Sequence, residues 1–133
     1  MKAALLALMF LLSPEVGTLK NGVVHVDAKE AAELLEARDD VIVLDVRTLG
    51  EFEKARIEGA TQIDFRSSEF KSKAAKLDPN ATYLVHCRSG GRSGRSLSVL
   101  KELGLENLYH LDGGLLGWEA ASLPVTSGAE PQE

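Results

Sequence analysis

The stretch that decides the fold is Leu84-Val85-His86-Cys87-Arg88-Ser89-Gly90-Gly91-Arg92-Ser93, and it contains the only cysteine of the chain. Residues 82–86, which lead into the cysteine, are β-branched and apolar, and this pattern predicts a buried strand. Residues 93–104 carry leucines at helical spacing and end at a glycine, which predicts an amphipathic helix. We therefore expect Cys87 to lie in a tight loop between the end of a strand and the start of a helix.

The residues that follow Cys87 suit a negatively charged sulfur atom. Gly90 and Gly91 allow positive φ angles and let the loop turn its amides inward. We expect Ser93 to be the N-cap of the helix. Backbone N–H groups and the positive end of a helix both stabilise a thiolate. The loop therefore predicts an anion-binding cradle around the Cys87 sulfur.

Two arginines, Arg88 and Arg92, add positive charge at the mouth of this loop. Guanidinium groups lower the pKa of a nearby thiol and bind anionic substrates. The alternative is that Cys87 is a small buried hydrophobe, but apolar residues would then be expected on both sides of it. A cysteine phosphatase needs an arginine at the sixth position after the thiol, where Ser93 stands. The spacing thus favours a thiolate that accepts a sulfur atom over one that accepts a phosphoryl group.

Strand-like and helix-like patterns alternate along the chain. The predicted strands are 23–26, 41–44, 61–64, 82–86 and 107–111, and the predicted helices are 28–38 (capped by Asp27), 48–55, 67–76, 93–104 and 115–121. This alternation predicts an α/β fold with a parallel sheet and helices on both faces. Ligands of such sheets bind outside the carboxyl ends of the strands, which is where Asp45, Arg47 and Cys87 fall.

Asp45 and Arg47 flank one residue at the end of a predicted strand, so their side chains share a face if the strand continues. Arg47 would then bind loop carbonyls or pair with Glu51. We favour a salt bridge that fixes the loop over a direct part in the chemistry.

The chain resembles the rhodanese family of sulfurtransferases at four motifs, which appear in the family's order between about Val23 and Pro124. The motifs are Asp45-Val46-Arg47 followed by Glu51-Phe52, then Ile57-Glu58-Gly59-Ala60, the cysteine loop, and Asp112-Gly113-Gly114-Leu115-Leu116-Gly117-Trp118. Four positions depart from the family pattern: Ala55-Arg56 replaces a usual Gly-His pair, and Ser96 and Leu97 stand where alanines are common. These departures concern packing more than chemistry.

The resemblance implies one rhodanese-like domain over residues 20–125, with a central parallel sheet of about five strands. It also implies that the Cys87 thiolate takes the outer sulfur of a donor such as thiosulfate and passes it, as a persulfide, to cyanide or a thiol. Arg88 and Arg92 would hold the anionic donor. The amides of Ser89, Gly90, Gly91 and Arg92 would stabilise the persulfide. The alternative is a persulfide carrier or non-catalytic docking module that serves a partner protein.

Composition narrows the remaining classes. A chain of 133 residues is long enough for one domain, and its net charge of −5 argues against nucleic acid as a partner. A single cysteine excludes an internal disulfide, so the persulfide needs an external thiol or protein acceptor. Cys87 forms no zinc pattern with the widely spaced His25, His86 and His110, which we interpret as structural, and we expect no metal and no cofactor. We expect a monomer, although the sequence does not fix the oligomeric state, the donor or the acceptor.

The two ends of the chain differ from the rest. Met1-Lys2 precedes an unbroken apolar run from Ala3 to Leu12, which predicts a signal peptide or leader over residues 1–17 and a periplasmic or secreted protein. The run is too short to span a bilayer as a helix. Because it lacks a clean cleavage site, the alternatives are an uncleaved anchor, a buried N-terminal helix and a cytoplasmic protein. The polar residues 126–133 predict a disordered tail.

Overall fold

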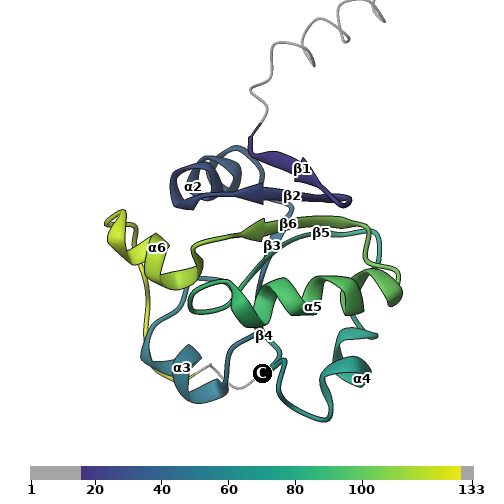
Figure 1. Ribbon diagram of the computed structural model, residues 1–133. Helices are drawn as coiled ribbons and strands as arrows, with labels where there is room; N and C mark the ends of the chain where they lie inside the picture. Colours follow the sequence, from purple (N-terminus) through teal and green to yellow (C-terminus); the bar gives the residue numbers. More distant parts are fainter. Residues whose placement is uncertain (1–15, 130–133) are drawn as a thin grey trace, which may run out of the picture.

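A six-stranded sheet organises residues 16–129, which are the residues described by the computed structural model (Figure 1). The strand order is β1-β2-β6-β5-β3-β4. The strands are β1 (Thr18–Lys20), β2 (Val23–Val26), β3 (Val41–Asp45), β4 (Thr61–Gln62), β5 (Thr82–His86) and β6 (Asn107–Leu111). All neighbours pair in parallel except β1 and β2. The predicted α/β fold is therefore confirmed.

Helices cover both faces of this sheet (Figure 1). They are α2 (Ala28–Ala37), α3 (Leu49–Lys54), α4 (Phe70–Ala74), α5 (Gly91–Glu102) and α6 (Gly114–Ala120). Phe70 of α4 and Leu100 of α5 pack with one core cluster, while Phe52 of α3 and Trp118 of α6 pack with the other. Each face thus has its own apolar core, and all five residues of β5 between the cores are buried. Burial on both faces explains why β3 and β5 are apolar without alternation.

The sheet has one strand more than the sequence predicted. β1 was missed because all three of its residues are exposed, so no hydrophobic pattern marks it. The turn into β2 is Asn21-Gly22, and both residues have positive φ, at 52° and 76°. Asn-Gly is a strong hairpin signal, and it was the available clue to β1.

The helices differ from prediction mainly in α4 and α5. Asp27 and Thr48 form capping boxes with Glu30 and Glu51. The first fixes the start of α2 where the sequence predicted it, and the second places the start of α3 one residue later than predicted, because Thr48 is the N-cap. The helix predicted over 67–76 shortens to the five residues of α4. The N-cap of α5 is Gly90, so the prediction that Ser93 caps this helix was wrong. Gly90 has a left-handed φ of 106° and its carbonyl accepts the Gly94 N–H, which starts the helix before Ser93.

The end of the described chain is paired with the body of the domain. Thr126 forms a β-bridge with Arg56, and the Arg56 side chain donates to the Gly128 carbonyl at 2.7 Å. The Gly128 N–H donates to the Glu53 carbonyl at 2.8 Å. At residues 126–128 the structure therefore differs from the predicted disordered tail, because Arg56 and Glu53 give the backbone of these residues hydrogen-bond partners.

The signal-peptide or leader prediction concerns mainly residues 1–15, which lie outside the described residues, as do 130–133. Among the described residues, none of the helices has both the length and the apolar character needed to cross a membrane.

Candidate active site

The candidate site lies where the carboxyl ends of three neighbouring strands meet. Asp45 ends β3, Cys87 follows β5, and Asp112 follows β6. Loops at this edge of a parallel sheet are the usual place for ligands. The topology therefore brings the predicted residues Asp45 and Cys87 to one edge of the sheet.

The Cys87 sulfur is buried and surrounded by donors, with only 1% of the residue exposed. The Gly90 N–H donates to Sγ at 3.1 Å, and the Ser93 hydroxyl lies 3.2 Å from Sγ. Burial by itself raises the pKa of the Cys87 thiol. Hydrogen bonds from Ser93, Gly90 and Ser89 outweigh burial and hold this pKa below its usual value. The loop thus favours a thiolate, as its sequence predicted.

The loop is held in place from the start of α6. The Leu115 N–H donates to the Cys87 carbonyl at 2.9 Å, and the Leu116 N–H donates to the Arg88 carbonyl at 3.0 Å. Both carbonyls of the loop thus have backbone N–H partners in α6. The start of α6, which belongs to the motif from Asp112 to Trp118, therefore supports the cysteine loop.

Two glycines allow this close approach. A Cβ atom on Gly90 would lie 2.3 Å from the Asp112 carbonyl oxygen, and one on Gly114 would lie 2.4 Å from the Arg88 carbonyl oxygen. Both glycines also have positive φ, at 106° and 61°. Any larger residue at either position would push the loop away from its support.

Arg92 forms an ion pair with Glu51, which the sequence did not predict. Its guanidinium binds both carboxylate oxygens of Glu51, at 2.7 and 2.9 Å. The hydrogen bonds from Arg92 lower the pKa of Glu51 to about 2, so the pair is charged at neutral pH. Arg92 therefore shares its charge with Glu51 and links α5 to α3.

Arg88 is exposed and lies beside a pocket of about 280 Å³. The polar residues that line this pocket with it are Arg47, Glu51, Lys54 and Glu119. Among the described residues, Arg88 and Lys54 are the cations of this pocket that form no ion pair with a carboxylate. The pocket therefore offers an anion a place next to the cysteine loop.

Asp45 and Arg47 form a buried salt bridge with each other, whereas the partner that the sequence suggested for Arg47 was Glu51. Arg47 donates to the two Asp45 oxygens at 2.8 and 2.7 Å, and neither side chain is more than 4% exposed. Arg47 also donates to the Ala55 carbonyl at 2.7 Å. Glu51 is bound to Arg92, so the alternative in which Arg47 pairs with Glu51 was wrong. Asp45 and Arg47 thus fix the segment that carries α3.

His86 is structural, as its place in the strand predicted. It is fully buried on the side of β5 away from the sulfur, and its Nδ1 lies 2.8 Å from the Cys87 carbonyl oxygen. Burial lowers the pKa of His86, although Asp45 opposes the shift. A neutral His86 donates to this carbonyl and orients the peptide that carries Cys87.

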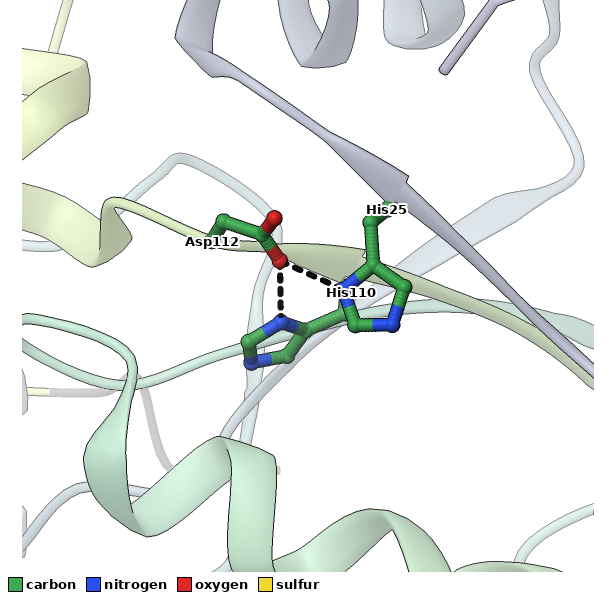
Figure 2. Close-up of side chains that lie close together, drawn as sticks. All are labelled: His25, His110 and Asp112. Carbon is green, nitrogen blue, oxygen red and sulfur yellow. Dashed lines mark hydrogen bonds and ion pairs between the residues drawn. The ribbon is translucent and has the colours of Figure 1, made fainter. Parts of the chain in front are cut away.

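A second group of polar residues, missed in the sequence, lies next to the thiol. His25 on β2 and His110 on β6 stand opposite each other in the sheet, and both Nδ1 atoms bind Asp112 Oδ1, at 2.6 and 2.7 Å (Figure 2). The other nitrogen of His110 lies 2.7 Å from the Ser93 hydroxyl. Distance along the chain hid this cluster, because parallel strands bring together residues far apart in sequence.

The cluster offers ligand types that metals use, with its atoms within 4.8 Å of one another. Ligands on one tetrahedral zinc lie about 3.3 Å apart, given Zn–N distances of about 2.0–2.1 Å. The contacts of 2.6 and 2.7 Å are hydrogen-bond lengths instead. We therefore describe His25, His110 and Asp112 as a hydrogen-bonded cluster.

The departures from the family pattern are explained by local packing. The Ser96 hydroxyl donates to the Ser93 carbonyl at 2.7 Å, which satisfies a buried polar group inside α5. Arg56 stacks over the Phe52 ring, 4.7 Å from its centroid. Both positions are therefore accommodated without change to the loop.

Comparison with known proteins agrees with this architecture. A family model described as "Rhodanese-like domain" matches residues 27–121. The chain is 34% identical over 98 residues to the Synechocystis protein slr1261, covering 74% of this chain and 54% of that protein. It is 30% identical over 125 residues to Thiosulfate sulfurtransferase 18 of Arabidopsis thaliana, covering 85% of this chain and 90% of that protein. The chain thus spans about half of the first relative and most of the second.

A solved structure shows the same fold. The crystal structure of a rhodanese-related protein from Thermoplasma volcanium superposes with a TM-score of 0.68 and 29% identity, covering 77% of this chain and 96% of that one. The chain belongs to the rhodanese-like family.

Proposed function

We propose that the protein is a sulfurtransferase that moves sulfane sulfur from a small anionic donor such as thiosulfate, through a Cys87 persulfide, to cyanide or a thiol. The observation that carries this proposal is the Cys87 sulfur itself, which accepts hydrogen bonds from the Gly90 amide and the Ser93 hydroxyl at the end of β5. Membership of the rhodanese-like family and a relative named as a thiosulfate sulfurtransferase support it.

The first half-reaction forms one S–S bond and breaks another. The Cys87 thiolate attacks the outer sulfur of thiosulfate, the S–S bond of thiosulfate breaks, and sulfite leaves with its electron pair. The enzyme then carries a persulfide, whose negative charge stays within the loop. The donors that stabilised the thiolate are placed to stabilise this charge as well.

The second half-reaction returns the enzyme to its starting state. Cyanide or a thiolate attacks the outer sulfur of the persulfide, and the Cys87 thiolate leaves. The chain has a single cysteine, so the acceptor must come from outside. No cofactor takes part in either half-reaction.

The donor is held, in this proposal, by the cations beside the loop. Arg88 and Lys54 line the neighbouring pocket, where the charge of Glu51 is balanced by Arg92. Bound thiosulfate would place its sulfonate group among these cations and its outer sulfur toward Cys87.

A persulfide carrier is the second candidate, and the burial of Cys87 favours it. A residue that is 1% exposed shields a persulfide from solvent oxidants while the persulfide is held for a partner protein. Such a carrier would take sulfur slowly from thiosulfate and quickly from the persulfide of a partner protein.

Steady-state kinetics distinguish these functions. Thiocyanate formation is measured while thiosulfate and cyanide are varied, with Cys87→Ser as the inactive variant and Asp40→Ala as a surface control. A sulfurtransferase gives parallel double-reciprocal lines and no activity in Cys87→Ser. Thiocyanate formation at the level of Cys87→Ser, with fast uptake from a protein persulfide, would replace the proposal with the carrier function.

A further inference from the structure

We propose that His110 removes the proton from Cys87 through the Ser93 hydroxyl, and that Asp112 and His25 hold His110 in position for this transfer. The inference rests on the proposed function for its biological meaning, because it concerns the thiol that would carry sulfur. It assigns His110 the role of general base, acting through Ser93.

An unbroken series of contacts connects the sulfur to the histidine pair. Ser93 Oγ lies 3.2 Å from Cys87 Sγ and 2.7 Å from His110 Nε2. On the other side of the ring, His110 Nδ1 lies 2.7 Å from Asp112 Oδ1, which also binds His25 Nδ1 at 2.6 Å (Figure 2). All of these distances are within hydrogen-bond range.

The contacts fix which nitrogen of His110 is the base. An ionised carboxylate only accepts hydrogen bonds, so Asp112 Oδ1 requires a proton on Nδ1 of each histidine. Nε2 of a neutral His110 then has a lone pair, and it faces the Ser93 hydroxyl. The Ser93 hydroxyl has one proton, which it donates to His110 while Cys87 is a thiol, so that its oxygen can accept the proton of the thiol. Ser93 donates to the sulfur only once Cys87 is a thiolate.

The electrostatics keep His110 available as a base at neutral pH. Burial lowers the pKa of His110, while the hydrogen bond and charge of Asp112 oppose the shift and His25 adds to it. The other charged groups that line the adjoining pocket of about 680 Å³ with His25 and Asp112 are Lys20, Asp27, Lys29 and Glu30. His86, on the far side of β5, is a further titratable group, and His110 contributes to lowering the pKa of His86.

The series of contacts runs from the buried Cys87 thiol to the solvent-exposed carboxylate of Asp112. Ser93 and His110 are 0% and 4% exposed, whereas the side chain of Asp112 is 56% exposed. A proton taken from the interior can therefore leave where Asp112 and His25 meet solvent. A cluster with only a packing role would not need this order from buried to exposed.

The transfer balances without any other reactant. The Cys87 S–H bond breaks, its proton goes to Ser93 Oγ, and the original Ser93 proton goes to His110 Nε2. The products are a Cys87 thiolate, a neutral Ser93 that now donates to it, and an imidazolium paired with the Asp112 carboxylate. The thiolate keeps the electron pair that attacks the donor sulfur.

The rate of alkylation of Cys87 by iodoacetamide tests the transfer without any sulfur donor, and the single cysteine makes the readout specific. Rates are measured from about pH 6 to about pH 10 and compared as the ratio of the low-pH rate to the high-pH rate. His110→Gln keeps a hydrogen-bonding group next to Ser93 but cannot take a proton. Asn107→Ala, at the exposed start of β6, is the control.

We expect His110→Gln to lower this ratio about tenfold or more, since the variant lacks the base that forms the thiolate at low pH. Ser93→Ala should lower the ratio as well, and Ser93→Thr, which keeps the hydroxyl, should restore it. Asn107→Ala should leave it unchanged. Equal ratios in wild type and His110→Gln, or a rate loss of the same size at every pH, would overturn the proposal.

The two proposals fail separately. A wild-type protein that shows the His110-dependent ratio but takes no sulfur from thiosulfate would keep the proton transfer and remove the proposed donor. If His110→Gln does not fold, the partly exposed Asp112→Asn is measured instead. It should lower the ratio, because the imidazolium of His110 loses its carboxylate partner, and an unchanged ratio would overturn the proposal.

Discussion

The environment of Cys87 is set by a few neighbouring residues. The sulfur accepts from Gly90 and Ser93, and the carbonyl of Cys87 itself is bound by Leu115 and oriented by His86. The sulfur is therefore contacted by donors, while the Cys87 carbonyl has other partners. Burial raises the pKa of the thiol, and the hydrogen bonds from Ser93, Gly90 and Ser89 outweigh it and lower this pKa.

Glycine at position 90 is required for this arrangement, and Gly94 provides a matched control. Gly90→Ala should lower stability by about 1–3 kcal/mol or more, since φ is positive and the new Cβ would meet the Asp112 carbonyl. Gly94→Ala lies within α5 with open space around it and should raise stability by about 0.5–1 kcal/mol. Urea unfolding measures both. A neutral Gly90→Ala would contradict the close approach of the loop to Asp112.

The sequence predicted the residues next to the sulfur but not all of their roles. Cys87, Gly90 and the following helix follow from composition and spacing alone. The role of Ser93 differs because the left-handed Gly90 starts the helix earlier and turns the Ser93 hydroxyl inward. A one-dimensional pattern shows that a serine stands near a helix start, but it does not show which face that serine occupies.

At the scale of elements, α3 and α5 are connected by one ion pair. Glu51 accepts both hydrogen bonds from Arg92 and also completes the capping box of α3 with Thr48. Hence the loop that carries Cys87 is held at its far end by α3 and at its near end by α6. Movement of either helix would change the position of the thiol.

Glu51→Gln tests this connection and its pH dependence. The variant keeps a capping group and loses the charge, so its stability at neutral pH should fall by roughly 1–2 kcal/mol, allowing for partial exposure of the pair. The Glu51 pKa is lowered in the folded state, from 4.5 to about 2. The stability it contributes is therefore complete above about pH 5 and is lost as the pH falls from about 4.5 toward 2.

The measurement is urea unfolding of wild type, Glu51→Gln and the exposed control Glu58→Gln at neutral and acidic pH. The gap between wild type and Glu51→Gln should narrow on acidification, whereas Glu58→Gln should follow wild type throughout. A gap that widens as the pH falls would show that the Glu51 carboxylate does not stabilise the fold.

The elements themselves were predictable to different degrees. Strands β2, β5 and β6 appear at their predicted bounds, because apolar runs mark buried strands. β1 was missed because its residues are exposed and carry no such pattern, and α4 is shorter than the predicted helix. The pairing of Glu51 with Arg92 was not predictable, because it depends on the packing of two helices far apart in the chain.

At the scale of the whole molecule, the sheet order decides which residues meet. β6 lies between β2 and β5, so the histidines of β2 and β6 become neighbours and β6 passes beside the cysteine loop. The sequence predicted an α/β sheet with its site at the carboxyl ends of the strands. It did not predict the strand order, and the His25–His110–Asp112 cluster follows from that order alone.

Native-state hydrogen exchange should show this organisation. β5 is buried along its whole length and pairs on both sides, so its amides and those of the neighbouring β6 should exchange slowest. β1 is an exposed edge strand and should exchange fastest among the strands. Protection in β1 equal to that in β5 would contradict the described architecture.

Intact-mass spectrometry tests the central claim most directly. The purified protein is measured before and after thiosulfate, then after cyanide, alongside Cys87→Ser. The account predicts a gain of one sulfur, about 32 Da, that requires Cys87 and disappears with cyanide. No gain in a protein whose thiol still alkylates readily would contradict sulfur transfer from thiosulfate through Cys87.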